Sequence, residues 1–314
     1  MKIKKISILL LSIFTGTVVS FASTANNQVF SMENKDGKIN AKTIEEAFNA
    51  SEMMVDVNNN MNSIFEKRYK KIHHKAYNLA IFRNNKAIAT LIKKYPSIGL
   101  ITPLSMSIYS DEKGNINIAT LSLEGMARIT NIPANNVDLI EYAKILDGAL
   151  HKALPKGSYL TKEQSSKSSQ KNLITSFSIE LDIEKGDTVV DAKDAFKEEF
   201  ESEIGSLGFL VPKSYDLHKE LIKADASNTY EFFDTYSIIR FNVIFPVSKE
   251  HPDAGAYAPF SLALYKKKGE DEMHVSFPSI SNWADDLGIS DKEALEEIKK
   301  TQSMIAGILE ELTE

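Results

Sequence analysis

Apolar and polar residues alternate strictly in two short stretches of the chain. Residues 104–109 (LSMSIY) and residues 260–265 (FSLALY) both place a large apolar side chain at every second position, with serine, alanine or tyrosine between. Because alternate side chains of a strand share one face, each stretch predicts a strand with one core-facing side. The opposite face carries Ser105 and Tyr109 in one stretch and Ser261 and Tyr265 in the other. The turn-forming residues 111–114 and the strand-like residues 115–121 complete a predicted hairpin.

A helical spacing of apolar residues takes over at the end of the chain. Ser290 and Glu293 have the spacing of a capping box, which predicts the start of a long helix. One stripe of that helix is predicted to contain Leu295, Ile298, Gln302, Ile305, Leu309 and Leu312. A similar helix-like segment covers residues 135–153. Helices with one apolar face that alternate with a partly antiparallel sheet indicate a two-layer α+β domain.

The two alternating stretches belong to a longer repeat. Residues 96–109 and 252–265 share the pattern P-x-x-G-x-x-x-P-x-S-x-x-x-Y at an offset of 156 residues. Residues 81–85 also align with 238–242 at an offset of 157, which makes Arg83 the counterpart of Arg240. A repeat unit of about 130–145 residues has the size of a domain rather than of a solenoid repeat.

The repeat therefore predicts two tandem domains related by internal duplication, each a two-layer α/β sandwich of the α+β class. We expect the first repeat domain over residues 27–155 and the second over residues 172–314. Residues 156–171 are polar and Ser-rich and are interpreted as the linker between them.

The repeated motifs resemble the family known as domain of unknown function 302. The resemblance rests on residues 81–122 and 238–278, in which a buried strand, a short helix and a Pro-Gly step lead into a strand that begins after a proline. Residues 203–221 are similar to the glycine-phenylalanine strand of that family. The resemblance implies two tandem copies. Many members have a cysteine after the strand proline, where this chain has Leu104 and Phe260, so thiol chemistry is not implied.

Residues 1–22 have the three parts of a secretory signal. Lysines at positions 2, 4 and 5 precede an apolar core that ends at Phe21, and Ser20-Phe21-Ala22 fits a cleavage site. The core is short for a membrane span, although an uncleaved anchor remains an alternative. We expect a periplasmic or secreted protein that begins near Ser23 and has no stable membrane anchor after cleavage.

Composition narrows the classes of partner. The chain contains no cysteine, which excludes disulfides, thiolate metal sites and a lipoprotein anchor. Its formal charge is −6, and removing the three lysines of the signal leaves −9. So acidic a chain is a poor candidate for binding nucleic acid.

Four polar side chains near the ends of the predicted strands are candidates for binding an anion. Arg83 with Asn85, and Arg240 with Asn242, could hold a carboxylate or phosphate through forked donors. Alternation across 236–245 would place Arg240 and Asn242 on one strand face. The alternative is that each arginine pairs with an acid or bridges the two repeats.

Two Ser–Tyr pairs form the second set of candidates, namely Ser105 with Tyr109 and Ser261 with Tyr265. They could contact a ligand, or they could form a sheet face that the other repeat covers. No histidine or lysine lies at a fixed spacing that would activate either serine. Trp283 is interpreted as a core residue, with a ligand pocket as the alternative.

The histidines do not form a metal-ligand pattern. No two of the six lie three or four residues apart, and the adjacent pair His73-His74 would point in different directions on a helix. We therefore expect no metal and no cofactor.

Two function classes remain open. The first is an exported, non-catalytic binding or accessory protein for an unknown small molecule or protein, a monomer whose two repeats form an intramolecular pseudo-dimer. The second is a periplasmic hydrolase or transferase that uses a cleft between the repeats. The presence of Arg83 and Arg240 in both repeats favours the first class.

Overall fold

The fold is mixed α+β with two antiparallel sheets. The computed structural model describes residues 25–161, 173–181, 183, 188–222 and 229–313. The expected signal, residues 1–22, and most of the expected linker, residues 162–171, lie outside these ranges. No helix in the described ranges is both long enough and apolar enough to cross a membrane.

The first half of the chain forms a sheet with the strand order β2-β3-β4-β5-β1-β6. Its elements in chain order are β1 (Asn27–Glu33), α1 (Ala41–Asn49), β2 (Met54–Asn60), α2 (Met61–Tyr69), β3 (Tyr77–Arg83), α3 (Asn85–Leu91), the 3-10 helix η1 (Pro96–Ile101), β4 (Leu104–Ser110), β5 (Asn115–Leu121), α4 (Leu123–Thr130), α5 (Val137–Ala153) and β6 (Ser158–Tyr159). The predicted strands at 104–109 and 115–121 are therefore confirmed as β4 and β5. Two residues of the expected linker form β6, which pairs with the outer edge of β1.

The second half repeats this order of elements. Its elements are β7 (Ile174–Glu180), α6 (Val189–Ser206), β8 (Leu210–Asp216), α7 (Leu217–Ile222), β9 (Tyr230–Ile239), α8 (Phe241–Glu250), the 3-10 helix η2 (Pro252–Ala256), β10 (Phe260–Lys267), β11 (Glu272–Pro278), α9 (Ser281–Leu287) and α10 (Lys292–Glu311). The sheet order β8-β9-β10-β11-β7 has the same connectivity as the first sheet without β6.

The strand register relates the two halves by an offset of 156 residues. The same offset holds for the strand that precedes the Pro-Gly step. Leu104 pairs with Phe82 in the first sheet, and Phe260 pairs with Ile238 in the second. Because positions 104 and 260 are equivalent in the repeated motif, β3 and β9 are equivalent at the same offset.

The predicted equivalence of Arg83 and Arg240 is therefore wrong. Arg83 corresponds to Ile239, and Arg240 corresponds to Asn84; Asn84 and Arg240 are the N-cap residues of α3 and α8. The one-residue shift arose because a short peptide with similar letters can be aligned in two registers. Since neighbouring strand residues point to opposite faces, the shift places the two arginines on different sides of their sheets.

The predicted alternation across 236–245 is also wrong beyond Ile239. Residues 241–250 form α8, in which Val243, Ile244 and Val247 are buried at helical spacing. A short apolar run satisfies both periods, and only the tertiary packing decides between them.

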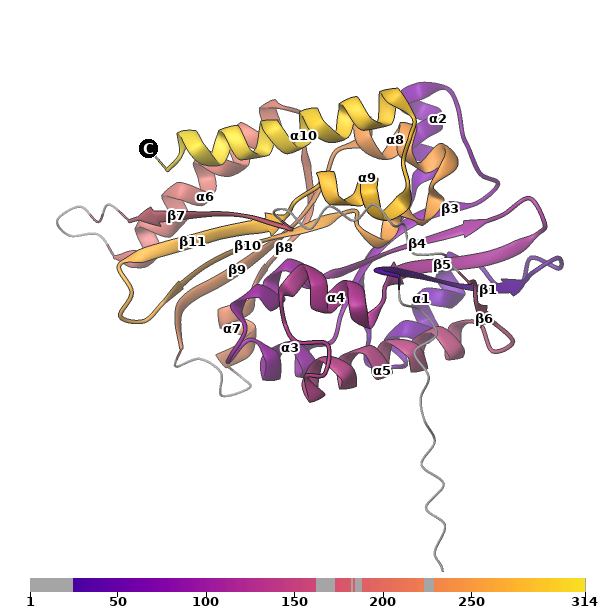
Figure 1. Cartoon of the computed structure of the whole chain (residues 1–314), viewed down its shortest axis with the longest axis horizontal. Helices are drawn as coiled ribbons and strands as arrows, with labels where there is room; N and C mark the ends of the chain where they lie inside the picture. The colour runs from indigo at the N-terminus through magenta and orange to yellow at the C-terminus, as the bar shows by residue number, and fades with distance from the viewer. Residues whose placement is uncertain (1–24, 162–172, 182, 184–187, 223–228, 314) are drawn as a thin grey trace, which may run out of the picture.

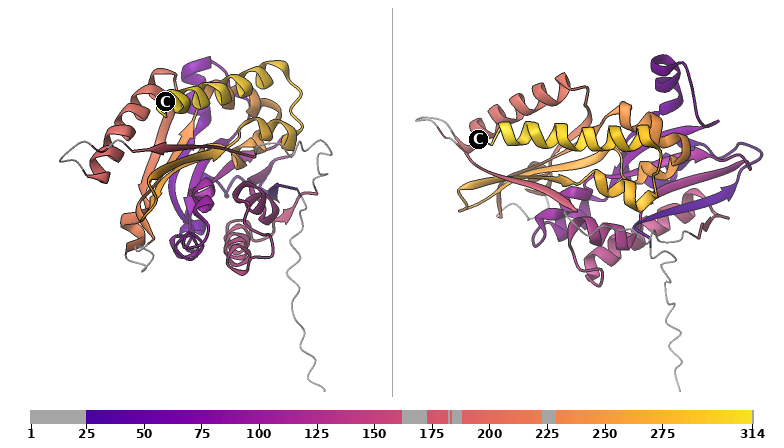
Figure 2. Two further views of the ribbon diagram at one scale, coloured as in Figure 1. Left: turned by 60° about the vertical axis from the view of Figure 1, so that its left-hand side comes forward. Right: turned by 45° about the horizontal axis from the view of Figure 1, so that its top comes forward.

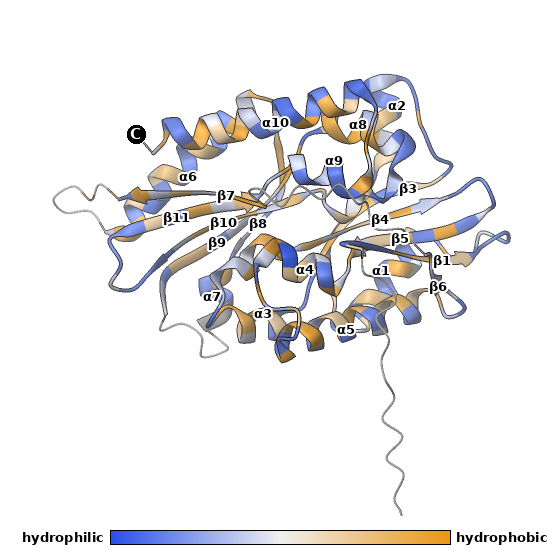
Figure 3. Ribbon diagram, viewed as in Figure 1, coloured by the Kyte–Doolittle hydropathy of each residue, from blue (hydrophilic) through white to orange (hydrophobic). Residues whose placement is uncertain are grey.

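The two sheets face each other, and the helices lie on the outer sides (Figures 1 and 2). α5 and α4 cover the first sheet, and α10 and α9 cover the second. The long helices carry one hydrophobic and one hydrophilic stripe, as expected for helices that pack on a sheet (Figure 3). Between the sheets, η1 of the first half packs on β10, and η2 of the second half packs on β4.

Two short helices reach the opposite half. α2 lies beside α8, where the ring of Tyr69 stacks on Phe245 at 3.9 Å between centroids. In the corresponding place on the other side, Glu220 of α7 forms an ion pair with Arg83. Each half therefore contributes a helix to the packing of the other.

The cap of α10 differs from the expected one. The N-cap residue is Asp291, whose Oδ1 accepts a hydrogen bond from the Ala294 amide at 2.9 Å, and Ser290 lies outside the helix. The predicted stripe includes the buried Ile298, Ile305 and Leu309. Asp291 is as good a cap as Ser290, so the sequence alone left the start uncertain by one residue.

Candidate functional site

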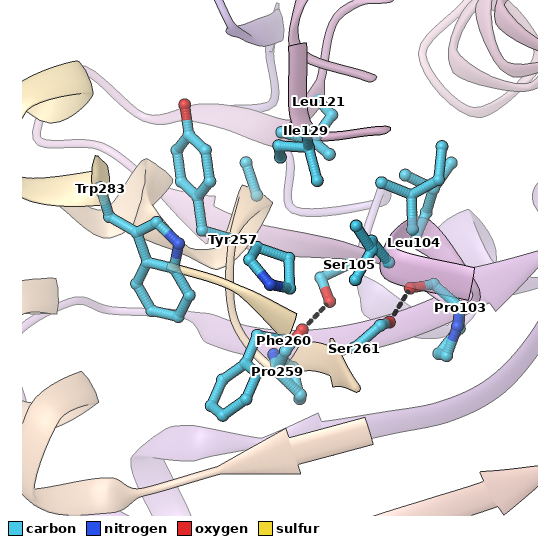
Figure 4. Close-up of a pocket in the computed structure, with 14 residues that line it drawn as sticks. Pro103, Leu104, Ser105, Leu121, Ile129, Tyr257, Pro259, Phe260, Ser261 and Trp283 are labelled. Carbon is cyan, nitrogen blue, oxygen red and sulfur yellow. Dashed lines mark hydrogen bonds between the residues drawn. The ribbon is translucent and has the colours of Figure 1, made fainter. Parts of the chain in front are cut away.

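The centre of the molecule is a closed seam between the halves. Ser105 Oγ donates a hydrogen bond to the carbonyl oxygen of Pro259, and Ser261 Oγ donates one to the carbonyl oxygen of Pro103 at 2.8 Å (Figure 4). The remaining space at this seam is about 20 Å³. Such a space holds about one water molecule, so the two serines stabilise the interface between the halves and do not line a ligand site.

The two tyrosines of the predicted sheet face, like the two serines, are packing residues. Tyr109 is buried, and Tyr265 is half-buried and stacks on Phe233 at 5.2 Å. Burial raises the pKa of both phenols, and the charge of Asp253 raises that of Tyr109 further. Both side chains are therefore neutral at ordinary pH, and neither is suited to act as a base.

Arg83 uses its donors in contacts within the protein. Its Nε donates to Asp56 Oδ2 at 3.0 Å, and its Nη1 donates to Asn85 Oδ1 at 2.7 Å and to Glu220. Its guanidinium also lies over the ring of Tyr215, 4.4 Å from the centroid. Burial alone would lower the pKa of Arg83, but hydrogen bonds and charges from Glu220 and Asp56 outweigh it and raise the pKa. Arg83 thus bridges the two halves through an ion pair.

Arg240 belongs to a different set of contacts. Its Nη1 donates to Glu297 Oε2 at 2.7 Å and to Thr301 Oγ1 at 3.1 Å, both in α10 of its own half. Asn242 accepts a hydrogen bond from the Tyr69 hydroxyl of the first half at 3.1 Å. No residue is shared between these contacts and those of Arg83. The structure therefore does not bring the two arginines together around one ligand.

Trp283 packs as a core residue. It is 5 % exposed, stacks on Tyr257 at 5.9 Å and lies 6.0 Å from the ring of Phe260. The cavities that it lines measure about 20 Å³ or less, so none of them admits a ligand larger than water.

A larger cavity lies where the loop after α2 meets α8 and the start of α10, and we call it the junction pocket. Its volume is about 180 Å³. The first half contributes Lys71 and His73, and the second half contributes the remaining residues. These are Phe245, Pro246, Val247, Lys249, Glu250, His251, Ile289, Asp291, Glu293 and Ala294.

The junction pocket combines an apolar floor with a charged rim. Val247, Ile289 and Ala294 are buried, whereas Lys71, Lys249, Glu250, Asp291 and Glu293 are exposed. Both signs of charge therefore surround one opening. This arrangement suits a small molecule that carries an amine and an acid on an apolar body.

His73 is a half-buried polar residue that lines the pocket. Its ring lies 4.5 Å from that of Phe245, and its Nε2 atom is buried without a hydrogen-bond partner. Burial lowers the pKa of His73, and His74 and Lys71 lower it further. A neutral imidazole with an unsatisfied nitrogen can accept or donate a hydrogen bond to a bound molecule.

This pocket was not predicted from the sequence, because the histidines were considered only for chelate spacing. His73 and His251 are far apart in the chain, and both line the pocket where the loop after α2 lies beside α8. One sequence signal could have pointed to this pocket, namely a histidine with a nearby lysine beside each repeated segment. His73 and Lys71 precede the strand before the first Pro-Gly segment, and His251 and Lys249 directly precede the second. Within the described ranges, no group of three His, Asp or Glu side chains has the geometry of a metal site.

Comparison with known proteins gives one family match. Residues 35–153 match the family model described as "Domain of unknown function DUF302", so this part of the chain forms one DUF302 domain. A solved structure, described as "Crystal structure of uncharacterized conserved protein DUF302 from Bacillus stearothermophilus", is 12% identical. The match covers 46% of this chain and 99% of that one, with a TM-score of 0.36. No curated protein matches.

Proposed function

We propose that this chain is an exported, non-catalytic binding protein made of two tandem DUF302-type domains that form an intramolecular pseudo-dimer. The proposed binding role rests on one observation. The junction pocket, at about 180 Å³, opens where the halves meet and takes side chains from both. The serines and arginines that the sequence singled out are used in contacts within the protein.

The assignment of a second domain rests on topology. Both halves have the same order of elements and the same strand order, and Tyr109 and Tyr265 lie on the equivalent strands β4 and β10. A monomer with this design has the symmetry of a dimer within one chain, which allows one side of the pseudo-symmetric pair to specialise. The junction pocket lies on one such side, beside α8.

The proposed ligand is a small zwitterion, such as a free amino acid. Its acid would face Lys71 and Lys249, and its amine would face Glu250 or Glu293, all of which line the pocket. Ionic hydrogen bonds of this kind fix orientation, while the apolar floor supplies most of the burial.

Calorimetric titration of the mature protein with a panel of amino acids tests the proposal. We expect saturable binding of one or a few of them, and a loss of roughly tenfold or more in the variant with both His73→Ala and Lys249→Ala. Lys268→Ala, at an exposed hairpin position, is the control and should leave binding unchanged. Equal affinity in the double variant would show that the ligand binds elsewhere.

Export is supported by the tripartite pattern of residues 1–22. Intact-mass measurement of the protein from cell fractions should give a chain that begins near Ser23 in the periplasmic or secreted fraction. A chain that still carries Met1–Phe21 in a fraction without membranes would refute this part of the proposal.

No specific observation favours the alternative of a hydrolase or transferase. Both serines of the repeated motif, which lie within the described ranges, donate their hydroxyl hydrogens to proline carbonyls, and neither has a histidine or lysine as a hydrogen-bond partner. An activated nucleophile needs such a base within hydrogen-bond reach.

A further inference from the structure

The outer edge of β7 is an unpaired strand edge. β7 is the last strand of the second sheet, and its pairing partner is β11 on the inner side. Among the described residues, no backbone group pairs with the outer side. An exposed edge of this kind presents a row of free amide and carbonyl groups to any extended segment that approaches.

The equivalent edge in the first half is occupied. There β6 pairs with β1 in antiparallel register, with Tyr159 opposite Phe30 and Ser158 opposite Ser31. The amide of Leu160 donates to the carbonyl of Val29 at 2.9 Å. The ring of Tyr159 packs edge-on against Phe30 at 4.8 Å between centroids. Phe30 is 0% exposed under this cover.

The register shows that β7 has the same pattern of groups. Ile108 and Leu264 are equivalent at the offset of 156 residues. Ile118 pairs with Ile108 and Val275 pairs with Leu264, so Ile118 and Val275 are equivalent as well. Phe30 pairs with the first and Phe177 with the second, so these two phenylalanines correspond. Each is followed by a serine. Phe177, however, is only half-buried.

The direction of the free groups follows from the same correspondence. Val29, whose carbonyl accepts from Leu160, is equivalent to Ser176, so the amide and carbonyl of Ser176 point outward. Leu173, three residues earlier, accepts from the Ser279 amide on the inner side, which agrees with this alternation. Ser176 and Ser178 are therefore the positions at which a new strand would bond.

We propose that this edge binds an extended segment of another protein, as an added antiparallel strand with an aromatic side chain over Phe177. The segment resembles the chain's own residues 156–160, Lys-Gly-Ser-Tyr-Leu, because that peptide already fits the equivalent edge. If the β6 register is continued by two residues on the β7 edge, the position of Lys156 lies opposite Glu180. A basic residue three positions before the aromatic residue is therefore complementary in charge to Glu180. Main-chain bonds supply affinity in this mode, and the side-chain pocket supplies specificity.

A second copy of this chain is a poorer occupant. Antiparallel pairing of two β7 strands centred on Phe177 would place Glu180 opposite Ile174, which offers the carboxylate no partner.

The test uses the mature full-length protein and the labelled peptide Lys-Gly-Ser-Tyr-Leu-Thr, blocked at both ends, in fluorescence anisotropy. We expect saturable binding that weakens roughly tenfold when the peptide tyrosine is replaced by alanine. Ser176→Pro should abolish binding because it removes an outward amide, a change that an edge strand tolerates. Ser176→Ala is the matched control and should bind like the wild type.

Amide hydrogen exchange keeps the test decisive if Ser176→Pro does not fold. Added peptide should slow exchange at Ser176 and Ser178 and leave the hairpin of β10 and β11 unchanged. Slow exchange at those two amides in the free monomer would mean that the edge is already covered, which overturns the proposal. Sedimentation of the free protein as a dimer with the same protection would assign the edge to a second copy instead.

Discussion

At the scale of single residues, the sequence identified polar side chains correctly as unusual but could not say what they contact. Arg83 follows a buried strand, and both a ligand and an acid of the other half were open interpretations. Asp56 and Glu220, which decide the matter, lie 27 and 137 residues away along the chain. The pairing with Asp56 depends on how β2 aligns with β3 in the first sheet, and the pairing with Glu220 depends on how the halves dock. No local sequence pattern shows either of them. His73 was set aside because no second histidine lies at chelate spacing, and its contact with Phe245 of the other half has no local sequence signal.

Replacing Arg83 should weaken the docking of the halves. Arg83→Ala leaves Asp56 and Glu220 without their partner, and we expect a loss of about 2 kcal/mol in the free energy of unfolding, since Glu220 is partly exposed. Arg240→Ala is the comparison, because its contacts with Glu297 and Thr301 lie within one half. Chemical denaturation measures both. Protease sensitivity between the halves should increase only in the Arg83 variant, and equal sensitivity in the two would contradict the bridging role.

The lowered pKa of His73 predicts a dependence of stability on pH. The folded protein holds the imidazole neutral below the ordinary histidine pKa of 6.5, whereas the unfolded chain protonates it there. The unfolded state therefore binds more protons, and stability should fall as pH decreases from about 6.5 toward the lower folded pKa. Melting curves at pH 7.5 and pH 5 should show a smaller acid-induced decrease in His73→Asn than in the wild type. An unchanged acid-induced decrease in His73→Asn would refute the prediction.

At the scale of elements, prediction succeeded where one periodicity was unambiguous. β4 and β5 were readable because strict alternation ends in the turn residues 111–114. α10 was readable because its apolar stripe continues for five turns. The reading failed at α8, where the run after Ile239 is apolar enough to satisfy both a strand and a helix. It also failed to anticipate β6, since two residues are too few to show any period.

The start of α10 offers a test at this scale. Asp291→Ala removes the side chain that caps the Ala294 amide, and we expect a loss of about 1 kcal/mol in the free energy of unfolding. Ser290→Ala removes a side chain outside the helix and should change stability by only a few tenths of that amount. Urea denaturation of the two variants measures the difference. A larger loss from Ser290→Ala would restore the capping box expected from the sequence.

At the scale of the whole molecule, the repeated motif forms the contact between the two halves, which the sequence alone did not show. Each repeated glycine sits in a 3-10 helix that packs against the sheet of the opposite half. A Cβ on Gly99 would lie 2.7 Å from Ala263 Cβ, and one on Gly255 would lie 2.4 Å from Ser107 Cβ. Serines 105 and 261 then bond across the same seam. The sequence established that two segments are alike and predicted the α+β class, but the close reciprocal approach follows from the packing of the halves.

The closeness of this approach gives the strongest test of the pseudo-dimer. Gly255→Ala should force the second half away from β4, because the nearest atoms include the Ser107 backbone nitrogen, 2.9 Å from the added carbon and unable to move alone. Overpacking of this kind costs about 1–3 kcal/mol, and the cost should fall on the interface rather than on either core. Gly148→Ala is the matched control: its added carbon meets nothing within 4 Å, and alanine in α5 should stabilise the chain slightly. Small-angle scattering of the mature protein should give a compact monomer for the wild type and for Gly148→Ala, and a larger radius of gyration or a lower melting temperature for Gly255→Ala. If Gly255→Ala matched the wild type in both measurements, the halves would not be held together through this seam.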